Sequence, residues 1–567
     1  MDKFTATGYP SIDKTHLKNV NKKLLKPTVL PLSIYGSFML INSKRLHEPA
    51  IQEGERIYSK QEIHDDVLTL IKSFKVCSVK RGQTLAIVTP NIYEGIVMTV
   101  AANAMGVKVA YFNSLAMDEE IASDVEKYAP DILFLYDKDP KSVQKVYNKS
   151  SVKFSMVINY EPETTSRSND PDVQNPGFRF ISFDAFKKCG EESSKGVSFT
   201  ILRNLFSKKV SLFLQTSGSS SGKPKVLPFT NECVFASMVY ASNSSGTKTN
   251  DTSVNKAMCI LPYRLPYGWT IMFIHLMGGN CVVLAPGASP EDIGNYYKYE
   301  PSYIYGTPVI LRAFMDNTPA NTDLSFLKAF FASGFSMSES LYAEAKDFFA
   351  KHNTPDIEIR NNYGIGEGLC IGTSSEGLPH REGTVGKLWY GPEWVIVDDD
   401  LNEVKYGEIG EVLVYSKTLC KGYLKEPELS KKTFIKFRGK RFYRSGDYMS
   451  LDVNGIVTFY GRRKRFYQPL GATDKVNCET IEKAICDCPI VKNCAVVVVP
   501  DEEKVQTGKA FVQLNDGVDA YDSAEKEIFE FISHKLLDYQ LPKYYCFLDE
   551  IPLMKSGKID YMKLEKM

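Results

Sequence analysis

Short apolar runs bounded by glycine or proline alternate with stretches of helical periodicity before about residue 400. The predicted strands are Thr84–Asn91, Val107–Ser114, Asp131–Asp137, Ala257–Tyr263 and Asn280–Gly287. Between such runs, apolar positions recur with a helical period, which predicts the helices Ile92–Gly106, Met117–Pro130 and Ser338–His352. This alternation predicts an α/β body whose layers contain mostly parallel strands.

After about residue 400 the pattern changes to short strands and turns. One predicted strand lies in Gly407–Ser416, and a hairpin over Tyr448–Gly461 is expected to turn at Asn454 and Gly455. We therefore expect the large body to include a β-rich subdomain.

The end of the chain returns to a compact α+β pattern. Its predicted elements are a helix over Cys478–Asp487, strands over Asn493–Pro500 and Ala510–Leu514, and a helix over Ala524–Leu537. The very basic stretch Gly461–Phe466 precedes this change. We expect an N-terminal domain over residues 1–462 and a small C-terminal domain over residues 463–567.

Composition narrows the class of protein. The 567 residues are 43% hydrophobic and 24% charged, as in globular chains of two to four domains. With 69 basic and 68 acidic residues, the net charge of +1 predicts no electrostatic binding of nucleic acid or of an acidic membrane.

Cysteine spacing and hydropathy predict the compartment. The twelve cysteines lack paired C-x-x-C spacing, so we expect free thiols in a reducing cytosol rather than a metal site. No apolar segment follows a basic start, and polar residues interrupt the most apolar windows. The expected protein is cytoplasmic, without a signal peptide or membrane span.

A Ser/Gly-rich loop within Leu214–Asn231, LQTSGSSSGKPKVLPFTN, follows a predicted strand. The common phosphate loop GxxxxGK[ST] does not fit, because Gly218 and Gly222 enclose only three residues and Pro224 stands at the hydroxyl position. A plain flexible loop would fit the composition. The two lysines of the loop instead favour a polyphosphate, since they add fixed positive charge to many hydroxyl and amide donors.

The segment TSGSSSGKPK resembles the phosphate loop of the adenylate-forming superfamily, which includes acyl-CoA synthetases, carrier-loading adenylation domains and beetle luciferases, with one extra serine. Further motifs of this superfamily follow in the same order along nearly the whole chain. The resemblance implies that the loop binds the β- and γ-phosphates of ATP through Thr216, Ser217, Gly218, Ser219, Ser220, Ser221, Gly222, Lys223 and Lys225.

The segment NNYGIGEG, residues 361–368, is similar to the family motif Tyr-Gly-x-Thr-Glu. The resemblance implies that Tyr363 stacks on adenine and that Glu367 holds Mg²⁺ with help from Thr216. Gly366 stands where the family has threonine, so we expect a loop serine to supply the missing hydroxyl. The implied nucleotide contacts of this region, including the Ser-Gly-Gly-like element ASGFSMSESL, are Gly334, Asn362, Tyr363 and Gly364.

Three motifs near the C-terminus complete the resemblance. YRSGDY resembles Tyr-x-Thr-Gly-Asp, which implies that Asp447 accepts hydrogen bonds from both ribose hydroxyls. GRRKRFYQPLG looks like the family hinge, with Arg462 on the nucleotide and Lys464 as the pivot. IPLMKSGKIDYMKL resembles the terminal motif and makes Lys558 the implied catalytic lysine. The implied C-terminal domain is mobile and rotates between the two half-reactions.

The chain departs from the family pattern at two places. After Gly471, GATDKVNCETIE has two additional residues, with Cys478 in place of proline and Thr480 in place of glutamate. In LPYRLPYGW, Arg264 and Leu265 replace an aromatic pair whose position rearranges between half-reactions in relatives. Both departures leave the handling of the acceptor open.

The resemblance implies an ATP- and Mg²⁺-dependent enzyme that converts a carboxylic acid to an acyl adenylate, releases pyrophosphate and transfers the acyl group to coenzyme A. One alternative acceptor is the phosphopantetheine thiol of a carrier protein. The basic stretch 431–444 offers charge either for such a carrier or for the 3′-phosphate of coenzyme A. The other alternative is a non-catalytic nucleotide or acyl-adenylate binder. Phe335 and Tyr240 would shorten the acid pocket, which favours a small or medium acid.

Overall fold

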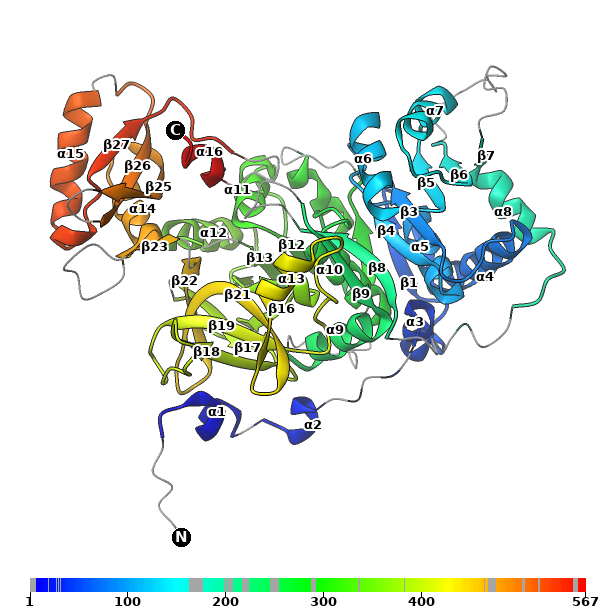
Figure 1. The fold of residues 1–567 in the computed structure, drawn as a ribbon, viewed down its shortest axis with the longest axis horizontal. Coiled ribbons are helices and arrows are strands. Elements are labelled where there is room, and N and C mark those ends of the chain that lie inside the picture. The colour runs from blue at the N-terminus through cyan, green and yellow to red at the C-terminus, as the bar shows by residue number, and fades with distance from the viewer. Residues whose placement is uncertain are drawn as a thin grey trace, which may run out of the picture.

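The computed structural model describes residues 7–18, 20–26, 28, 30, 32–162, 177–197, 201, 208–216, 224–244, 254–286, 292–334, 337–381, 383–462, 465–467, 476–501, 505–518, 521–553 and 559–567. These residues build two seven-stranded sheets, one eight-stranded sheet and small sheets of three and two strands. In Figure 1 the C-terminal elements lie beside the body that the three large sheets form.

The first sheet is parallel except at one edge, in the order β7-β6-β5-β3-β4-β8-β9. Its strands are β3 (Thr84–Val88), β4 (Lys108–Tyr111), β5 (Ile132–Tyr136), β6 (Met156–Tyr160), β7 (Arg179–Ser182), β8 (Val210–Gln215) and β9 (Val226–Thr230). The associated helices are α4 (Lys60–Val76), α5 (Tyr93–Met105), α6 (Asp118–Tyr128), α7 (Pro140–Lys149) and α8 (Phe183–Glu191). Every strand and helix predicted for this part is confirmed, with ends shifted by a few residues.

The second sheet has the order β14-β13-β12-β10-β11-β1-β2, and only its β1–β2 pair is antiparallel. Its strands are β1 (Pro49–Glu53), β2 (Arg56–Ser59), β10 (Lys256–Cys259), β11 (Cys281–Leu284), β12 (Tyr303–Gly306), β13 (Ala329–Ala332) and β14 (Glu358–Arg360). Its helices are α3 (Ile34–Asn42), α9 (Asn231–Ser244), α10 (Pro266–Met277), η3 (Ile293–Tyr299), α11 (Pro308–Asn317) and α12 (Glu339–Lys351).

Local sequence explains several of these boundaries. Helix α4 begins with a capping box, in which the Ser59 hydroxyl accepts from Glu62 N and the Glu62 carboxylate accepts from Ser59 N. Helix α5 ends at Gly106, whose φ of 78° is the left-handed conformation that glycine adopts without strain. Helix α10 begins at Pro266, and a first-turn proline removes a backbone N–H that has no helical partner.

The third sheet forms the β-rich subdomain, in the order β15-β16-β17-β22-β21-β19-β18 with β20 paired to β21. The strands are β15 (Gly364–Ile365), β16 (Ile371–Ser374), β17 (Thr384–Leu388), β18 (Glu393–Val397), β19 (Gly410–Tyr415), β20 (Phe434–Phe437), β21 (Lys440–Leu451) and β22 (Ile456–Arg462). The short 3-10 helix η4 (Gly366–Gly368) and the α-helix α13 (Pro427–Thr433) belong to this part. The predicted hairpin at Asn454 and Gly455 is confirmed, but β21 begins at Lys440, ahead of the predicted Tyr448.

The N-terminal segment contacts the β-rich subdomain. It contains α1 (Pro10–Asp13), η1 (Thr15–Leu17) and α2 (Lys22–Leu25). Ser11 N donates a 2.8 Å hydrogen bond to the Glu403 carboxylate, and His16 Nδ1 lies 2.8 Å from the Tyr406 hydroxyl.

The C-terminal residues have an apolar core of their own, centred on Ile481, Ile485, Val496 and Ile528. The elements are β23 (Phe466–Tyr467), β24 (Val476–Asn477), α14 (Cys478–Cys486), β25 (Val491–Asp501), β26 (Val505–Leu514), α15 (Tyr521–Ser533), η6 (Asp538–Gln540), β27 (Tyr544–Phe547) and α16 (Tyr561–Leu564). Strand β26 starts earlier than predicted because it pairs with β25 along its whole length.

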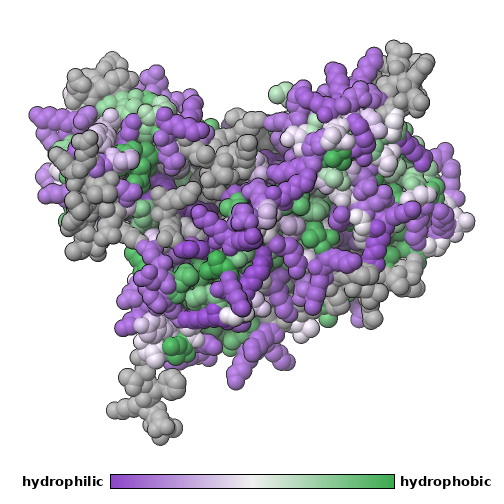
Figure 2. Space-filling model, in the orientation of Figure 1, coloured by the Kyte–Doolittle hydropathy of each residue, from purple (hydrophilic) through white to green (hydrophobic). Residues whose placement is uncertain are grey.

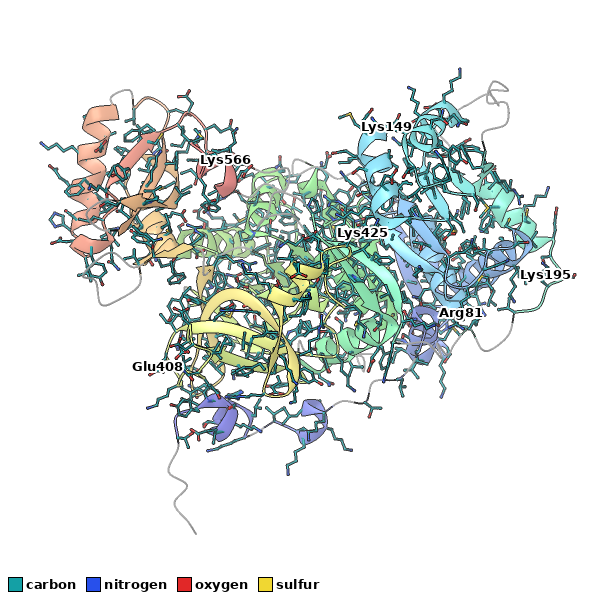
Figure 3. The ribbon with its side chains drawn as sticks, in the orientation of Figure 1. Arg81, Lys149, Lys195, Glu408, Lys425 and Lys566 are labelled. Carbon is teal, nitrogen blue, oxygen red and sulfur yellow. The ribbon has the colours of Figure 1, made fainter. Side chains whose placement is uncertain are left out.

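Apolar side chains are concentrated inside the fold. The largest apolar cluster runs from the first sheet through α10 to the β-rich subdomain. Figure 2 shows a mostly hydrophilic face, and Figure 3 shows charged side chains on all parts of the molecule, such as Arg81, Lys149, Lys195, Glu408, Lys425 and Lys566. Among the described residues, no helix combines the length and apolar character that crossing a membrane requires. All twelve cysteines are free.

A pair of facing glycines gives a matched stability test. Gly364 and Gly372 are opposite each other in β15 and β16, but a Cβ at Gly372 would lie 1.8 Å from Tyr363 O, whereas one at Gly364 would lie 3.5 Å from its nearest atom, Cys370 O. We expect Gly372→Ala to destabilise the protein by about 1–3 kcal/mol through overpacking. Gly364→Ala should change stability by less than about 0.5 kcal/mol. Apparent melting temperatures of the two variants test this, and equal shifts would contradict it.

Candidate functional site

Strands β8 and β9 hold the two ends of the predicted phosphate loop. Thr216 follows β8 and Lys225 precedes β9. Thr216 N donates a 2.9 Å hydrogen bond to Lys225 O, and Lys225 N donates a 3.0 Å bond to Thr216 Oγ1. The predicted phosphate ligands between them, Ser217, Gly218, Ser219, Ser220, Ser221, Gly222 and Lys223, lie outside the described residues.

Glu367 lies in η4 and is fixed by the segment that follows β19. Cys420 N donates a 2.8 Å hydrogen bond to Glu367 O, and the Tyr423 hydroxyl donates a 2.7 Å bond to Glu367 Oε1. Lys225 Nζ lies 5.2 Å from the centre of the Tyr423 ring. One tyrosine therefore connects the end of the phosphate loop to the carboxylate predicted to hold Mg²⁺.

Tyr423 was not among the predicted site residues. It lies in KGYLKEPE, outside the motifs quoted in the sequence analysis, and its place in the folded chain brings it to Glu367. Its neighbourhood is fixed by backbone bonds from Lys421 N to Pro228 O and from Leu424 N to Val226 O. These bonds attach the segment to β9 and so to the phosphate loop.

Asp447 is the centre of the predicted ribose site. It is 3% exposed within β21, opposite Arg462 in β22. Its Oδ2 accepts a 2.6 Å hydrogen bond from the Tyr363 hydroxyl, and its Oδ1 lies 2.9 Å from Arg462 Nε. Burial raises the pKa of this carboxyl, while the Arg462 guanidinium opposes the rise. The structure thus brings together three residues predicted to bind the nucleoside.

Asn362 and Gly334 lie beside Tyr363. Asn362 Oδ1 accepts hydrogen bonds from Ser375 N and Oγ at 3.0 and 2.8 Å, and Asn362 N donates to Ser333 Oγ at 3.4 Å. Gly334 follows Ser333 with a φ of 90°, and a Cβ built there would meet no atom of the described residues within 4 Å. None of these residues therefore prevents a ligand from approaching the Gly334 backbone closely.

Two models of known protein families match this chain. The AMP-binding enzyme model matches residues 42–424, and the AMP-binding enzyme C-terminal domain model matches residues 480–558. The chain belongs to the family of AMP-binding enzymes. This confirms the predicted family, the α/β body with a small C-terminal domain, and the prediction of an acid–thiol ligase type of enzyme.

The relatives differ in how much of each chain is shared. 4-Coumarate–CoA ligase-like 4 of Oryza sativa subsp. japonica is 23% identical over 86% of this chain and 84% of its own length. Tyrocidine synthase 3 of Brevibacillus parabrevis is 26% identical over 62% of this chain, which spans only 5% of that protein. The crystal structure of the anthranilate CoA ligase AuaEII with anthranoyl-AMP has a TM-score of 0.76 at 19% identity, covering 95% of this chain and 98% of that one.

The donors near the phosphate loop suit a Mg²⁺ ion that keeps most of its ligands on phosphate and water. Glu367 is partly exposed, and Tyr423 occupies only Oε1 of its carboxylate. Thr216 Oγ1 accepts one bond from Lys225 N and keeps a second lone pair. Among the described residues, no cluster of three His, Cys, Asp or Glu side chains forms a closed metal site. The residues fit an ion that binds with the nucleotide.

The two residues predicted to act from the C-terminal part, Lys464 and Lys558, lie outside the described residues. Close to Lys464 in the sequence, the backbone at Gly461 packs against the start of α14. A Cβ built at Gly461 would lie 2.8 Å from the Glu479 carboxyl group. Cys478, which replaces the family proline, is fully buried in the C-terminal core.

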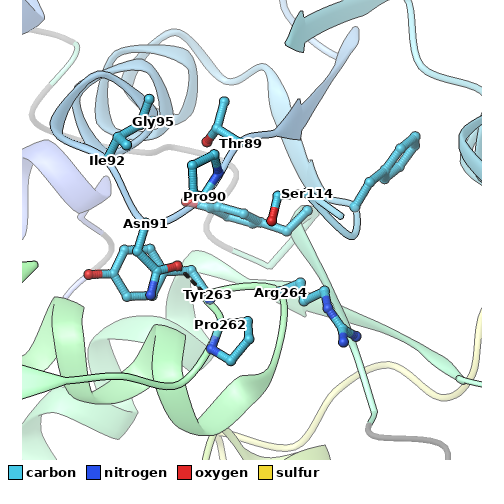
Figure 4. Close-up of a pocket in the computed structure, with 11 residues that line it drawn as sticks. Thr89, Pro90, Asn91, Ile92, Gly95, Ser114, Pro262, Tyr263 and Arg264 are labelled. Carbon is cyan, nitrogen blue, oxygen red and sulfur yellow. Dashed lines mark hydrogen bonds between the residues drawn. The ribbon is translucent and has the colours of Figure 1, made fainter. Parts of the chain in front are cut away.

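The departure at Arg264 borders a pocket between the first two sheets (Figure 4). The pocket is small, with a volume of about 20 Å³, and is lined by segments at or after the ends of β3, β4 and β10. Arg264 O accepts a 2.8 Å hydrogen bond from Gln215 N, directly before Thr216. The segment that lacks the family's aromatic pair is therefore attached to the base of the phosphate loop.

Gly366 offers room for the threonine found in the family. Among the described residues, a Cβ there would meet Pro266 alone, at 3.6 Å, and Gly366 has no positive φ. We expect Gly366→Thr to fold normally and to lower KM for ATP by about tenfold, as one added hydrogen bond to phosphate would. Gly366→Val is the matched control without the hydroxyl. Equal KM values for the two variants, measured by pyrophosphate exchange, would contradict a hydroxyl contact.

Tyr423 gives a second test. Tyr423→Phe removes the hydroxyl that orients Glu367, so we expect the Mg²⁺ concentration for half-maximal activity to rise about tenfold, the lower end of the range for lost supporting groups. Tyr93→Phe is the matched control, because it removes a 2.9 Å hydrogen bond from the hydroxyl at the start of α5 to the Asp66 carboxylate of α4. A Mg²⁺ titration that is the same for both variants would argue against this role of Tyr423.

Proposed function

We propose that this protein activates a carboxylic acid with ATP and transfers the acyl group to coenzyme A. The observation that carries the proposal is the pairing of two sites. Lys225 and Glu367 meet through Tyr423 on the phosphate side, and Asp447 lies between Tyr363 and Arg462 on the nucleoside side. Such an arrangement holds ATP by both ends and leaves its α-phosphate between them.

In the first half-reaction a carboxylate oxygen attacks the α-phosphorus, and the bond to the bridging oxygen of the β-phosphate breaks. Acyl adenylate forms and pyrophosphate leaves. Because an anion attacks an anion, positioning and positive charge dominate the catalysis. Lys225 and the loop Ser217–Lys223 would hold the β- and γ-phosphates, and Lys558 would neutralise charge on the reacting carboxylate and phosphate oxygens. Glu367 and Thr216 would hold Mg²⁺, which supplies further positive charge when bound.

Recognition of the nucleoside falls to the buried group around Asp447. Tyr363 and Arg462 each occupy one carboxylate oxygen, and a carboxylate has about four acceptor positions, so both oxygens can still accept from a ribose hydroxyl. The Tyr363 ring would contact adenine beside Gly334, with Asn362 and Gly364 on the same side. Arg462 ends β22, so the ribose site lies directly before the predicted hinge.

In the second half-reaction a thiolate attacks the carbonyl carbon, a C–S bond forms, and AMP leaves as the C–O bond breaks. We propose that the domain over 463–567 rotates about Lys464 between the steps, which withdraws Lys558 and admits the thiol. The body would be residues 1–462. We also propose a cytoplasmic location and a role in the metabolism of fatty or other carboxylic acids.

A carrier protein is the second candidate acceptor, favoured by the 26% identity to tyrocidine synthase 3. The basic stretch 431–444 supports neither acceptor strongly, because several of its basic side chains form ion pairs with carboxylates of this chain. Arg438 lies 2.8 Å from Glu403, Arg444 lies 2.8 Å from Glu411, and Lys440 pairs with Glu393. Thioester formation with saturating coenzyme A, compared with purified carrier protein, separates the two acceptors.

Acid-dependent exchange of labelled pyrophosphate into ATP, over acids of graded length, tests the adenylation itself. We expect exchange with at least one small or medium acid. Absence of exchange across the whole panel would instead support a non-catalytic nucleotide or acyl-adenylate binder.

The role of Lys558 separates the half-reactions. We expect Lys558→Ala to reduce adenylate formation by about two to three orders of magnitude, the typical effect of removing a preorganised stabilising group. Thioester formation from a preformed acyl adenylate should stay near the wild-type rate, because the lysine is withdrawn in that step. Single-turnover measurements of both steps test this, and equal losses would refute the division of roles.

A further inference from the structure

Arg465 is fixed to the C-terminal part of the chain. It directly follows Lys464, the predicted pivot of the hinge. Its side chain is only 15% exposed, and its Nη2 lies 2.5 Å from Glu482 Oε1 in an ion pair. Its Nη1 lies 3.8 Å from Glu479 Oε1. The chain is therefore attached to α14 by the first residue that follows the pivot.

Glu482 of α14 joins three further segments of the C-terminal part. Besides its pairing with Arg465, Oε1 accepts a 2.6 Å hydrogen bond from Val496 N of β25 and a 3.1 Å bond from the Tyr561 hydroxyl of α16. Burial raises the pKa of the Glu482 carboxyl, while the Arg465 guanidinium opposes the rise. The arginine thus favours the ionised carboxylate at the centre of these contacts.

The ring of Tyr561 completes the group. Arg465 Cζ lies 4.1 Å from the centre of this ring, which is a cation–π contact. Tyr561 is the first residue of α16 and stands three residues after Lys558, the implied catalytic lysine. We call Arg465, Glu482 and Tyr561 the hinge cluster, because it connects the residue after the pivot to the segment that carries the lysine.

The segment that carries Lys558 is held at its two ends. Leu553 and Ile559 pair in an antiparallel bridge. Ile559 and Tyr561 pack against the same apolar cluster of the C-terminal part. A displacement of Tyr561 would therefore also move Ile559 and the lysine that directly precedes it.

A second arginine fixes the other side of the hinge to the body. Arg462 Nη1 donates a 2.9 Å hydrogen bond to Ser445 O, and Arg462 Nε lies 2.9 Å from Asp447 Oδ1. Arg462 is thus bound to the β-rich subdomain, and Arg465 is bound to the C-terminal part. A rotation about Lys464, which lies between these two anchors, would carry the hinge cluster along with the C-terminal part.

We propose that Arg465 is a positioning residue for Lys558. Through Glu482 and Tyr561 it fixes the place of the catalytic lysine relative to the hinge. The inference rests on the proposed adenylation and on the proposed role of Lys558. A guanidinium suits this task, because its planar group can pair with a carboxylate and lie over an aromatic ring at the same time. The cluster would move as one unit and bring Lys558 to the same place in every turnover.

Single-turnover rates of the two half-reactions test this, with the acid from acetate to octanoate that supports the fastest pyrophosphate exchange. We expect Arg465→Met to slow adenylate formation about 10- to 100-fold, since a misplacement of about 1 Å can cost about 100-fold in rate. KM for ATP should stay within about twofold, because the predicted nucleotide contacts lie in the body. Thioester formation from a preformed acyl adenylate should also stay within about twofold, because Lys558 is withdrawn in that step.

Tyr561→Phe is a milder variant that keeps the ring and removes the hydroxyl bond to Glu482. We expect it to slow adenylate formation about three- to tenfold, as the loss of one hydrogen bond would. Tyr544→Phe is the matched control, because it removes a 3.1 Å bond from a hydroxyl to the Asp501 carboxylate in the same part of the chain. The control should leave both half-reactions at the wild-type rate.

Lys535→Met is the matched control for Arg465→Met. Lys535 Nζ pairs with Asp487 Oδ2 at 2.8 Å and lies 4.4 Å from the centre of the Phe531 ring. The C-terminal part therefore has a second cation that combines an ion pair with a ring contact. Its removal should leave both half-reactions at the wild-type rate.

A double-variant cycle separates positioning from a general structural role. If Arg465 acts through Lys558, adding Arg465→Met to Lys558→Ala should slow adenylate formation by less than about twofold further. A purely structural role would instead give the same loss with and without the lysine.

Equal losses in both half-reactions, in variants with wild-type melting temperatures, would overturn the inference. An additive cycle would overturn it too, as would equal effects of Tyr561→Phe and Tyr544→Phe. In each of these cases the wild type still exchanges pyrophosphate, so the proposed adenylation stands. Absence of exchange by the wild type with every acid would instead refute the proposed function, and the inference with it.

Discussion

The turn that carries Glu367 is held by helix α9 and by the β-rich subdomain, and both halves of the candidate site lie next to it. Leu369 and Cys370 follow the turn with φ values of 50° and 56°, left-handed conformations that cost non-glycine residues about 1–3 kcal/mol each. Contacts from several elements stabilise them. Ser237 of α9 donates a 3.0 Å hydrogen bond to Leu369 O, and Cys420 N of the β-rich subdomain donates to Glu367 O.

This arrangement explains why the site lies where the sheets meet. The phosphate side comes from β8 and β9 of the first sheet, the nucleoside side comes from β21 and β22 of the third, and the Gly334 segment follows β13 of the second. Each group is fixed on a strand end or a short turn, so its position follows from strand pairing rather than from a long flexible segment. The Asp447–Arg462 pair extends this order to the last residue of β22.

The sequence predicted the elements of the fold well where a simple period was present. Parallel strands such as β3 and β5 are short, continuous and apolar, and the hairpin at Gly455 has a recognisable turn pair. It predicted β21 poorly, because Ser445, Gly446 and Asp447 resemble a turn while the flanking strands pair through them. In β21, pairing with distant strands overrides the local preference of these residues for a turn.

The same division applies to the candidate site. Thr216, Tyr363, Glu367 and Asp447 could be named from the sequence because they lie in segments that resemble motifs of the family. Tyr423 lies outside the quoted motifs, and it was visible only once folding brought it between Lys225 and Glu367. Its function needs one hydroxyl at one place, and no residue spacing along the chain specifies that place.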